Sequence, residues 1–150
     1  MIDTLRLKEI RNDKGIKQSE IAEYLNIKKD TYSKYETNGA IPSLETIFYF
    51  AKYFELNIDF VLGLKDTRTK AIYNNYDKYL IAINLKYLRN KNNYTQMSLG
   101  NKINVTHAAI NLYENAKTNP SLNIVYKYVK LFHISFHDLC TKDFNKEDKS

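Results

Sequence analysis

Hydrophobic residues recur along this chain at intervals of three and four positions, which is the spacing of an amphipathic helix. In residues 3–14 the pattern places Leu5, Leu7 and Ile10 on one face. The same spacing predicts helices over 18–25, 29–36 and 44–54, and a short one from Asn57 or Ile58 to Leu62. No run alternates apolar and polar residues, so no strand is expected. The pattern therefore predicts an all-α chain.

Residues that accept a left-handed backbone separate these helices. Gly15 follows the first helix, Asn26 follows the second, and Asn38-Gly39 follows the third. Glycine lacks a Cβ, and asparagine tolerates positive φ better than most residues, so both suit tight turns. These turns mark off a unit of five short helices, which ends at Gly63.

The five-helix pattern occurs twice. Displacing the chain by 78 positions brings residues 2–62 onto 80–140 without a gap, and 13 of those 61 pairs are identical. The second copy predicts helices near 79–91, 96–103, 107–114, 121–132 and 136–140. A repeat of this length that occurs only twice indicates two small domains rather than a solenoid.

The repeat also predicts the domain boundaries. We expect a first domain over residues 1–64, a linker over 65–78, a second domain over 79–140 and a flexible tail over 141–150. The later part of the linker is expected to join the first helix of the second domain. The tail carries mixed charge without an apolar pattern, so we expect it to be frayed.

Charge is unevenly distributed over the two copies. The chain has a net charge of +6, yet residues 1–64 hold 9 basic and 10 acidic residues, which give −1. Residues 79–139 hold 7 basic and 2 acidic residues, which give +5. A basic half suggests a polyanionic partner, and the alternative is that this charge serves only solubility. Cys140 is the single cysteine, which fits a reducing cytoplasm, and no apolar run is long enough to cross a membrane.

Two of the predicted helices in each copy are short and joined by a tight turn, which is the pattern of a helix-turn-helix. The first copy reads Gln18-Ser19-Glu20-Ile21-Ala22, Tyr35-Glu36-Thr37-Asn38-Gly39 and Pro42-Ser43-Leu44-Glu45-Thr46. The second reads Gln96-Met97-Ser98-Leu99-Gly100, Tyr113-Glu114-Asn115 and Asn119-Pro120-Ser121-Leu122. These sequences resemble the lambda-repressor-like domain of XRE-type transcription regulators. The resemblance implies an all-α fold of two tandem five-helix lambda-repressor-like DNA-binding domains.

The resemblance also implies which residues contact double-stranded DNA, with helices 29–36 and 107–114 entering the major groove. In the first copy the implied contacts are Gln18, Lys28, Lys29, Asp30, Thr31, Ser33, Lys34 and Asn38. In the second copy they are Gln96, Thr106, His107, Ala108, Asn111 and Lys117. Lysine can donate to guanine, aspartate can accept from cytosine, asparagine can pair with adenine, and alanine can touch a thymine methyl group.

Other matched residues are expected to orient the motif rather than touch bases. By resemblance, Arg11 forms an ion pair with Glu36, and Arg89 repeats it with Glu114. Leu112 departs from the pattern, because it stands where a polar base-reading residue is expected.

These features predict a sequence-specific DNA-binding transcription regulator, and the resemblance makes it a repressor. One chain can cover two half-sites, or two chains can form a homodimer. The alternative is an antitoxin-like or anti-repressor-like module that binds a protein, with weak or no DNA binding by the second domain. No nucleophile elbow, phosphate-binding loop or cluster of metal ligands is present in the sequence, so no enzyme, cofactor or metal is expected.

Overall fold

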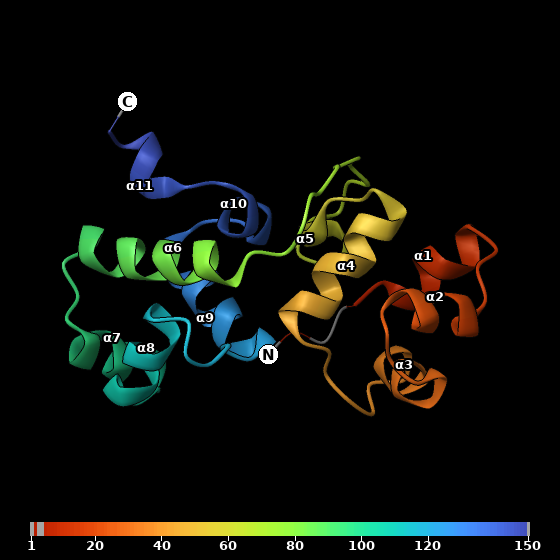
Figure 1. The fold of residues 1–150 in the computed structure, drawn as a ribbon, viewed down its shortest axis with the longest axis horizontal. Helices are drawn as coiled ribbons and strands as arrows, with labels where there is room; N and C mark the ends of the chain where they lie inside the picture. The colour runs from red at the N-terminus through yellow and green to blue at the C-terminus, as the bar shows by residue number, and fades with distance from the viewer. Residues whose placement is uncertain (1, 3–4, 150) are drawn as a thin grey trace. The chain divides into compact units, whose positions relative to one another are not determined.

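The computed structural model describes residue 2 and residues 5–149 (Figure 1). Within that part the chain is helical, and the strand-like feature there is an isolated bridge between Leu56 and Lys70. The chain separates into two compact units, Met1–Tyr76 and Asp77–Ser150, which we call unit 1 and unit 2. The prediction of an all-α fold with two tandem domains is confirmed.

The described residues of unit 1 form five helices around one core. They are α1 (Leu7–Asp13), α2 (Gln18–Tyr24), α3 (Lys29–Glu36), α4 (Leu44–Phe54) and α5 (Ile58–Val61). Each helix sends at least one apolar side chain with 0% exposed surface to the centre. These side chains are Ile10, Ile21, Tyr32, Ile47 and Ile58. The longest helix, α4, begins where the hydroxyl of Ser43 accepts a hydrogen bond from the Thr46 amide at 3.1 Å.

Unit 2 repeats this architecture and extends it. Its helices are α6 (Lys78–Lys91), α7 (Gln96–Ile103), α8 (His107–Glu114), α9 (Leu122–Phe132), α10 (Phe136–Thr141) and α11 (Phe144–Glu147). Its fully buried core includes Leu85, Leu99, Ile110, Val125 and Phe136. All five lie 78 positions after buried core residues of unit 1, so the same positions form the centre of both units.

The backbone turns coincide as closely as the cores do. Positive φ angles occur at four pairs of positions 78 residues apart: Gly15 and Asn93, Asn26 and Asn104, Asn38 and Ala116, and Glu55 and His133. The predicted turns at Gly15, Asn26 and Asn38 are therefore present. Only some of the eight residues suit this conformation. Ala116, with φ of 55°, has a Cβ and no side-chain polar group to offset the strain.

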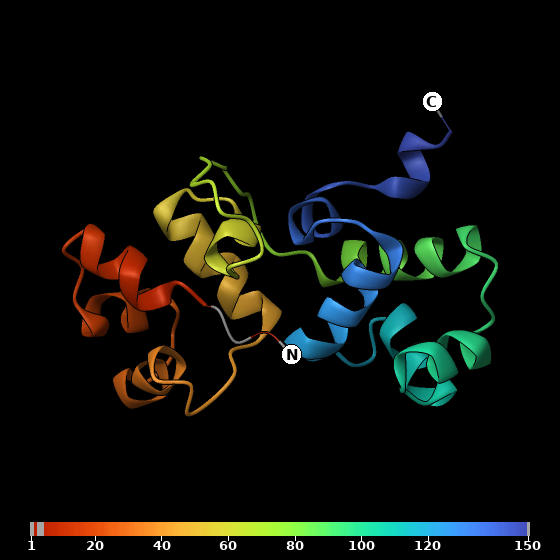
Figure 2. The ribbon, with the colours of Figure 1, turned by 180° about the vertical axis from the view of Figure 1, so that it is seen from behind.

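Residues 65–76, expected to be a linker, form a strap on unit 1 that lies beside α4 and α5 in both views (Figures 1 and 2). Its backbone bonds the turn after α4: Asn57 donates to the Thr69 carbonyl at 2.8 Å, and Ala71 donates to the Glu55 carbonyl at 3.1 Å. Tyr73 is buried, and its hydroxyl accepts from the Ile58 amide at 3.0 Å.

The later part of the linker was expected to be helical and to join the first helix of the second domain. Only Lys78 of residues 65–78 belongs to a helix. Helix α6 begins there because the Asp77 carboxylate accepts hydrogen bonds from the amides of Tyr79 and Leu80, at 3.0 and 3.1 Å. An N-cap of this kind fixes the start of a helix.

The tail that was predicted to be flexible contains the short helix α11. The ring of Phe144 stacks on Tyr87 of α6 with centroids 6.3 Å apart, and Lys91 pairs with Asp148 at 3.1 Å. Asn84, which is fully buried, accepts a hydrogen bond from the Phe144 amide at 3.2 Å. These contacts hold α11 against α6.

A residue near the start of each unit fastens the chain that leaves its last core helix. In unit 1 the Arg6 guanidinium donates to the carbonyls of Phe60 and Lys65, at 2.8 and 2.6 Å. In unit 2 the Asn84 amide, 78 positions later, donates to the carbonyls of Leu139 and Lys142, at 2.9 and 2.6 Å. Different side chains therefore perform the same structural role.

Candidate nucleic-acid interface

The turn between α2 and α3 is closed by a short-range hydrogen bond. Asn26 has φ of 57°, and the next residue, Ile27, donates its amide to the Ala22 carbonyl at 3.0 Å. Ala22 is 2% exposed. A small buried residue at this position lets α2 pack closely on the chain that enters α3.

The corresponding turn of unit 2 packs more tightly still. Asn104 has φ of 58°, and Val105 donates to the Gly100 carbonyl at 2.9 Å. A Cβ added at Gly100 would collide with the backbone oxygen of Val105. Glycine is therefore required here by space, although it lowers the helix propensity of α7.

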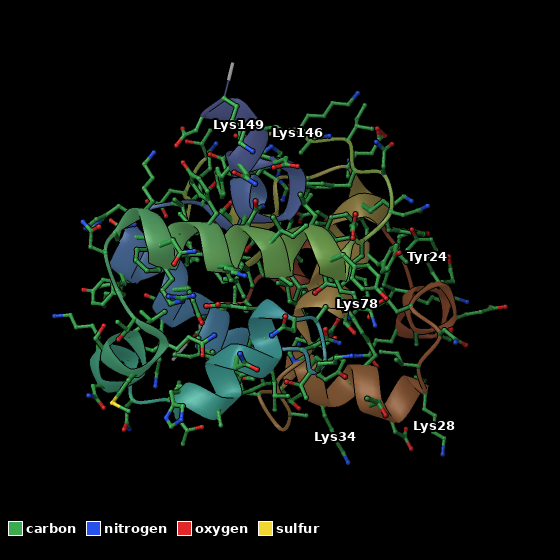
Figure 3. The ribbon with its side chains drawn as sticks, turned by 60° about the vertical axis from the view of Figure 1, so that its left-hand side comes forward. Tyr24, Lys28, Lys34, Lys78, Lys146 and Lys149 are labelled. Atoms are coloured by element: carbon green, nitrogen blue, oxygen red, sulfur yellow. The ribbon has the colours of Figure 1, made fainter. Side chains whose placement is uncertain are left out.

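The candidate base-reading residues of unit 1 lie on the solvent side of α3. Lys28, Lys29, Asp30 and Lys34 are exposed, whereas Thr31 and Ser33 are half-buried. Figure 3 shows Lys28 and Lys34 projecting to the same side, away from the rest of unit 1. The Lys34 carbonyl accepts from the Gly39 amide at 2.8 Å, so the turn that contains exposed Asn38 folds back on the end of α3.

A buried ion pair holds the end of α3 to α1. The Arg11 guanidinium donates two hydrogen bonds to the Glu36 carboxylate, at 2.6 and 3.0 Å, in a fork. The side chains are 11% and 2% exposed. Burial alone would raise the pKa of Glu36, but hydrogen bonds from Arg11 and Gln18 and the charge of Arg11 outweigh it, so the pKa lies below its usual range.

Unit 2 contains the same pair. The Arg89 guanidinium binds the Glu114 carboxylate at 2.6 and 2.9 Å, with side chains 10% and 1% exposed. The hydrogen bond to Glu114 raises the pKa of Arg89 above its ordinary value. Both ion pairs that the resemblance implied are thus present, and each ties the second helix of the helix-turn-helix to the first helix of its unit.

The two glutamines expected at phosphates also join these pairs. Gln18 donates from its amide to Glu36 at 2.8 Å, and Gln96 donates to Glu114 at 3.3 Å. The sequence did not indicate this contact, since spacing alone cannot tell which way a half-buried amide turns. A phosphate contact by either glutamine stays a prediction.

A buried tyrosine borders each ion pair, a contact that the helical spacing alone does not indicate. In unit 1 it is Tyr32 of α3, which stacks on Phe50 of α4. In unit 2 the same two positions hold Ile110 and Tyr128, so the tyrosine has moved to the other helix. Burial, followed by the nearby glutamate, raises the pKa of each phenol. The signal available in the sequence was this exchange of aromatic and aliphatic residues between paired positions.

The candidate reading face of unit 2 is less polar. His107, Ala108 and Asn111 are exposed on α8, and Leu112 is 41% exposed. Thr106 caps the helix by accepting from the Ala109 amide at 3.1 Å. The first turns of α7 and α8 contain no acidic residue, whereas α3 carries Asp30 there. Lys117 is exposed in the turn that follows.

Helix α7 also begins with a capping box. The Thr95 hydroxyl accepts from the Ser98 amide at 3.0 Å, and the Ser98 hydroxyl accepts from the Thr95 amide at 2.9 Å. The spacing of these two residues was the available signal, although glutamate or glutamine is the usual partner in such a box.

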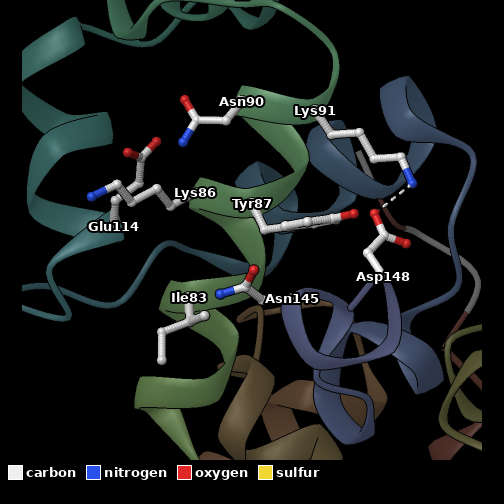
Figure 4. Close-up of a pocket in the computed structure, with 8 residues that line it drawn as sticks. All are labelled: Ile83, Lys86, Tyr87, Asn90, Lys91, Glu114, Asn145 and Asp148. Atoms are coloured by element: carbon white, nitrogen blue, oxygen red, sulfur yellow. Dashed lines mark hydrogen bonds and ion pairs between the residues drawn. The ribbon is translucent and has the colours of Figure 1, made fainter. Parts of the chain in front are cut away.

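A groove of about 690 Å³ lies beside α6 and α11 of unit 2 (Figure 4). Its lining residues are Ile83, Lys86, Tyr87, Asn90, Lys91, Glu114, Asn145 and Asp148. The ion pair between Lys91 and Asp148 crosses one end. The lining mixes apolar groups with charges of both signs, so it favours no single class of ligand.

Within the part of the chain that the structure describes, no helix is both long and apolar enough to cross a membrane. No three histidine, cysteine or acidic side chains among those residues are grouped to hold a metal ion.

Comparison with known proteins agrees with this geometry. A helix-turn-helix family model matches residues 7–61 and again residues 85–139. The uncharacterized HTH-type transcriptional regulator YobD of Bacillus subtilis (strain 168) is 30% identical over 61 residues, which are 41% of this chain and 54% of that protein. Among solved structures, none matches the chain.

Two other proteins of the same bacterium are similar. The SPbeta prophage-derived uncharacterized regulator YonR is 37% identical over 57 residues, 38% of this chain and 53% of that protein. The HTH-type transcriptional regulator ImmR is 34% identical over 65 residues, 43% of this chain and 51% of that protein. The chain thus spans about half the length of these relatives. Because the family model covers most of both units, the chain belongs to the XRE-type helix-turn-helix family and carries the family's domain twice.

Proposed function

We propose that this protein is a sequence-specific double-stranded DNA-binding transcription regulator that acts as a repressor in the cytoplasm. Helices α3 and α8 would each enter a major groove. The observation that carries the proposal is the exposed polar face of α3, held from behind by the buried pair of Arg11 and Glu36. Family membership and the names of the relatives, which are transcriptional regulators, support it.

The chemistry of α3 suits base edges in the major groove. Lys29 and Lys34 can donate to guanine O6 and N7, and Asp30 can accept from cytosine N4. Lys28 lies at the edge of the same face, where a phosphate contact would position the helix without reading sequence. Because the ion pair ties α3 to α1, these side chains approach DNA from a fixed backbone. Little ordering of the helix is then needed on binding.

The positive charge of unit 2 supports the same function. Its second-copy residues 79–139 carry seven basic residues and two acidic ones, Glu114 and Asp138. Glu114 is buried against Arg89, and Asp138 lies 3.6 Å from Lys142. A surface of this charge attracts a polyanion, and binding should weaken steeply as salt rises.

The test begins with selection of bound duplexes from a random pool by the full chain, followed by a gel shift on the selected site. Lys34→Ala should weaken binding by about 1–3 kcal/mol and relax selection at one base pair. Lys65→Ala is the matched control, since it removes an equally charged, exposed lysine from the strap. Equal effects of the two substitutions would overturn the assigned reading face. Sedimentation of the complex would show whether one chain or a homodimer fills the site.

A second candidate function is a module that binds a protein, in the manner of an antitoxin or anti-repressor. Two exposed apolar residues of unit 2 favour it: Leu112 on α8 and Met97 on α7, which are 41% and 60% exposed. The discriminating result is the absence of any shifted complex at micromolar protein and low salt. In that case the helix-turn-helix serves as a scaffold for a protein contact.

A further inference from the structure

The two reading helices differ along one row of side chains. On α3, Asp30 and Lys34 are four positions apart and therefore neighbours on the helix surface. Ala108 and Leu112 occupy the same two positions on α8. All four residues are exposed. A row with two opposite charges in unit 1 is thus an apolar row in unit 2.

This apolar row is not part of the core of unit 2. The side chain that α8 sends inward is Ile110, which has 0% exposed surface, whereas Leu112 keeps 41% of its surface. Contact with another apolar group removes an exposed leucine from water, and this lowers the free energy of the system. In the major groove the apolar group available is the 5-methyl group of thymine.

The row beside it suits the other base of the same pair. His107 and Asn111 are also four positions apart, and both are exposed. An asparagine amide can form two hydrogen bonds with adenine N6 and N7. A single face of α8 therefore offers a methyl-binding row next to an adenine-binding side chain.

Charge around this face favours DNA over a protein as the partner. The first turn of α8 contains no acid, and Lys117 is exposed in the turn after the helix. The one acidic residue of α8, Glu114, is 1% exposed and paired with Arg89. A polyanion can approach without meeting an opposing negative charge on this helix.

We infer that unit 2 recognises A·T base pairs through the thymine methyl group, with Leu112 and Ala108 as the methyl contacts, whereas unit 1 recognises its half-site through polar contacts. This inference rests on the proposed function. It makes the preferred DNA site asymmetric, because the two half-sites are read by different chemistry.

The test replaces thymine by deoxyuridine in the selected duplex, which removes the methyl group and keeps the hydrogen-bonding edges. The half-site of unit 2 is first identified as the one whose selection is lost in the double variant His107→Ala and Asn111→Ala. Deoxyuridine in that half-site should weaken binding about fourfold for each methyl group contacted. The same replacement in the other half-site should change affinity less than twofold.

Leu112→Ala then separates a direct contact from a change in DNA shape. It should weaken binding to the thymine duplex and largely remove the effect of deoxyuridine, since the two changes delete the same contact. Ile83→Ala is the matched control, because it shortens an exposed aliphatic side chain on α6, outside the helix-turn-helix. This control should retain full sensitivity to deoxyuridine.

The outcomes distinguish the proposed DNA-binding function from the inferred recognition of thymine methyl groups by unit 2. Failure to bind any duplex overturns the proposed function and the inference together. Binding that ignores deoxyuridine in the half-site of unit 2, or sensitivity that persists in Leu112→Ala, overturns the inference alone. Unchanged affinity of Leu112→Ala for the thymine duplex would likewise overturn the inference alone.

Discussion

The ion pair of Arg11 and Glu36 allows a direct test of how α3 is held. We expect Glu36→Gln, which removes the charge and keeps the shape, to lower the free energy of unfolding of unit 1 by about 3–5 kcal/mol. The reason is that the Arg11 side chain left without its partner charge is only 11% exposed, so little water reaches it. A domain of this size has a total free energy of unfolding of several kcal/mol, so the substitution would remove most of its stability.

The measurement should resolve the two units within the full chain. Hydrogen exchange read by mass spectrometry does so, because peptides of α1 and α3 report on unit 1 and peptides of α6 and α8 report on unit 2. Glu36→Gln should speed exchange in unit 1 and leave unit 2 unchanged.

An exposed ion pair in the same unit provides the matched control. Lys70 and Glu55 lie 3.9 Å apart, and their side chains are 73% and 50% exposed. Glu55→Gln should therefore lower the free energy of unfolding of unit 1 by no more than about 1 kcal/mol. If Glu36→Gln lowered the free energy of unfolding as little as this control does, the buried pair would not hold α3 against α1, and the prediction would be wrong.

The pH dependence follows from the direction of the pKa shift. The pKa of Glu36 is lower in the folded unit than in the unfolded chain. The carboxylate therefore contributes stability above its unfolded pKa, and this contribution is lost as the pH falls through the folded value. The difference in urea midpoint between wild type and Glu36→Gln should narrow toward acid pH. A constant difference across that range would contradict the assignment.

Three other substitutions test features specific to unit 2. Ala116→Asn should raise its unfolding free energy by about 1 kcal/mol, since asparagine tolerates the left-handed backbone at that turn, and a urea midpoint that fails to rise would contradict this. Gly100→Ala should destabilise the helix-turn-helix, because the added Cβ meets the Val105 carbonyl, and faster exchange at α7 and α8 would show it. Phe144→Ala should release α11 from Tyr87 and expose it to limited proteolysis, while the rest of unit 2 stays protected.

The helices and turns could be predicted because their signals are local. Apolar spacing identifies the face that each helix buries, and a glycine or asparagine marks most left-handed turns. The gap-free repeat strengthened these predictions, since Asn26 and Asn104 had to serve the same turn. Glu55 and His133 show the limit of the signal. Both adopt the left-handed conformation at the end of a long helix without a sequence that favours it.

The strap and the tail could not be predicted, because their contacts join segments far apart in sequence. Residues 65–76 have no helical periodicity, and their order depends on backbone hydrogen bonds to Glu55 and Asn57 and on the burial of Tyr73. The contacts of Arg6 and Asn84 were hidden for another reason. A guanidinium and an amide are chemically unlike, so the repeat gave no indication that both fasten the chain after the last core helix.

Helices α3 and α8 differ from each other in one way on their buried side and in another way on their exposed side. Behind the helix, Tyr32 with Phe50 in unit 1 becomes Ile110 with Tyr128 in unit 2, so one change is compensated by another and a phenol still borders the ion pair. The packing of the interior requires such compensation, because cores are filled to near crystal density.

On the exposed side no compensation accompanies the change from Asp30 and Lys34 to Ala108 and Leu112. Solubility alone would favour polar residues at both positions, yet Leu112 leaves 41% of its surface in water. A helix held by an intact ion pair, with a capped start and an apolar row facing outward, fits the methyl-binding surface that we infer for unit 2. On that inference the divergence reflects a second half-site of different base composition, and not the decay of a duplicated domain.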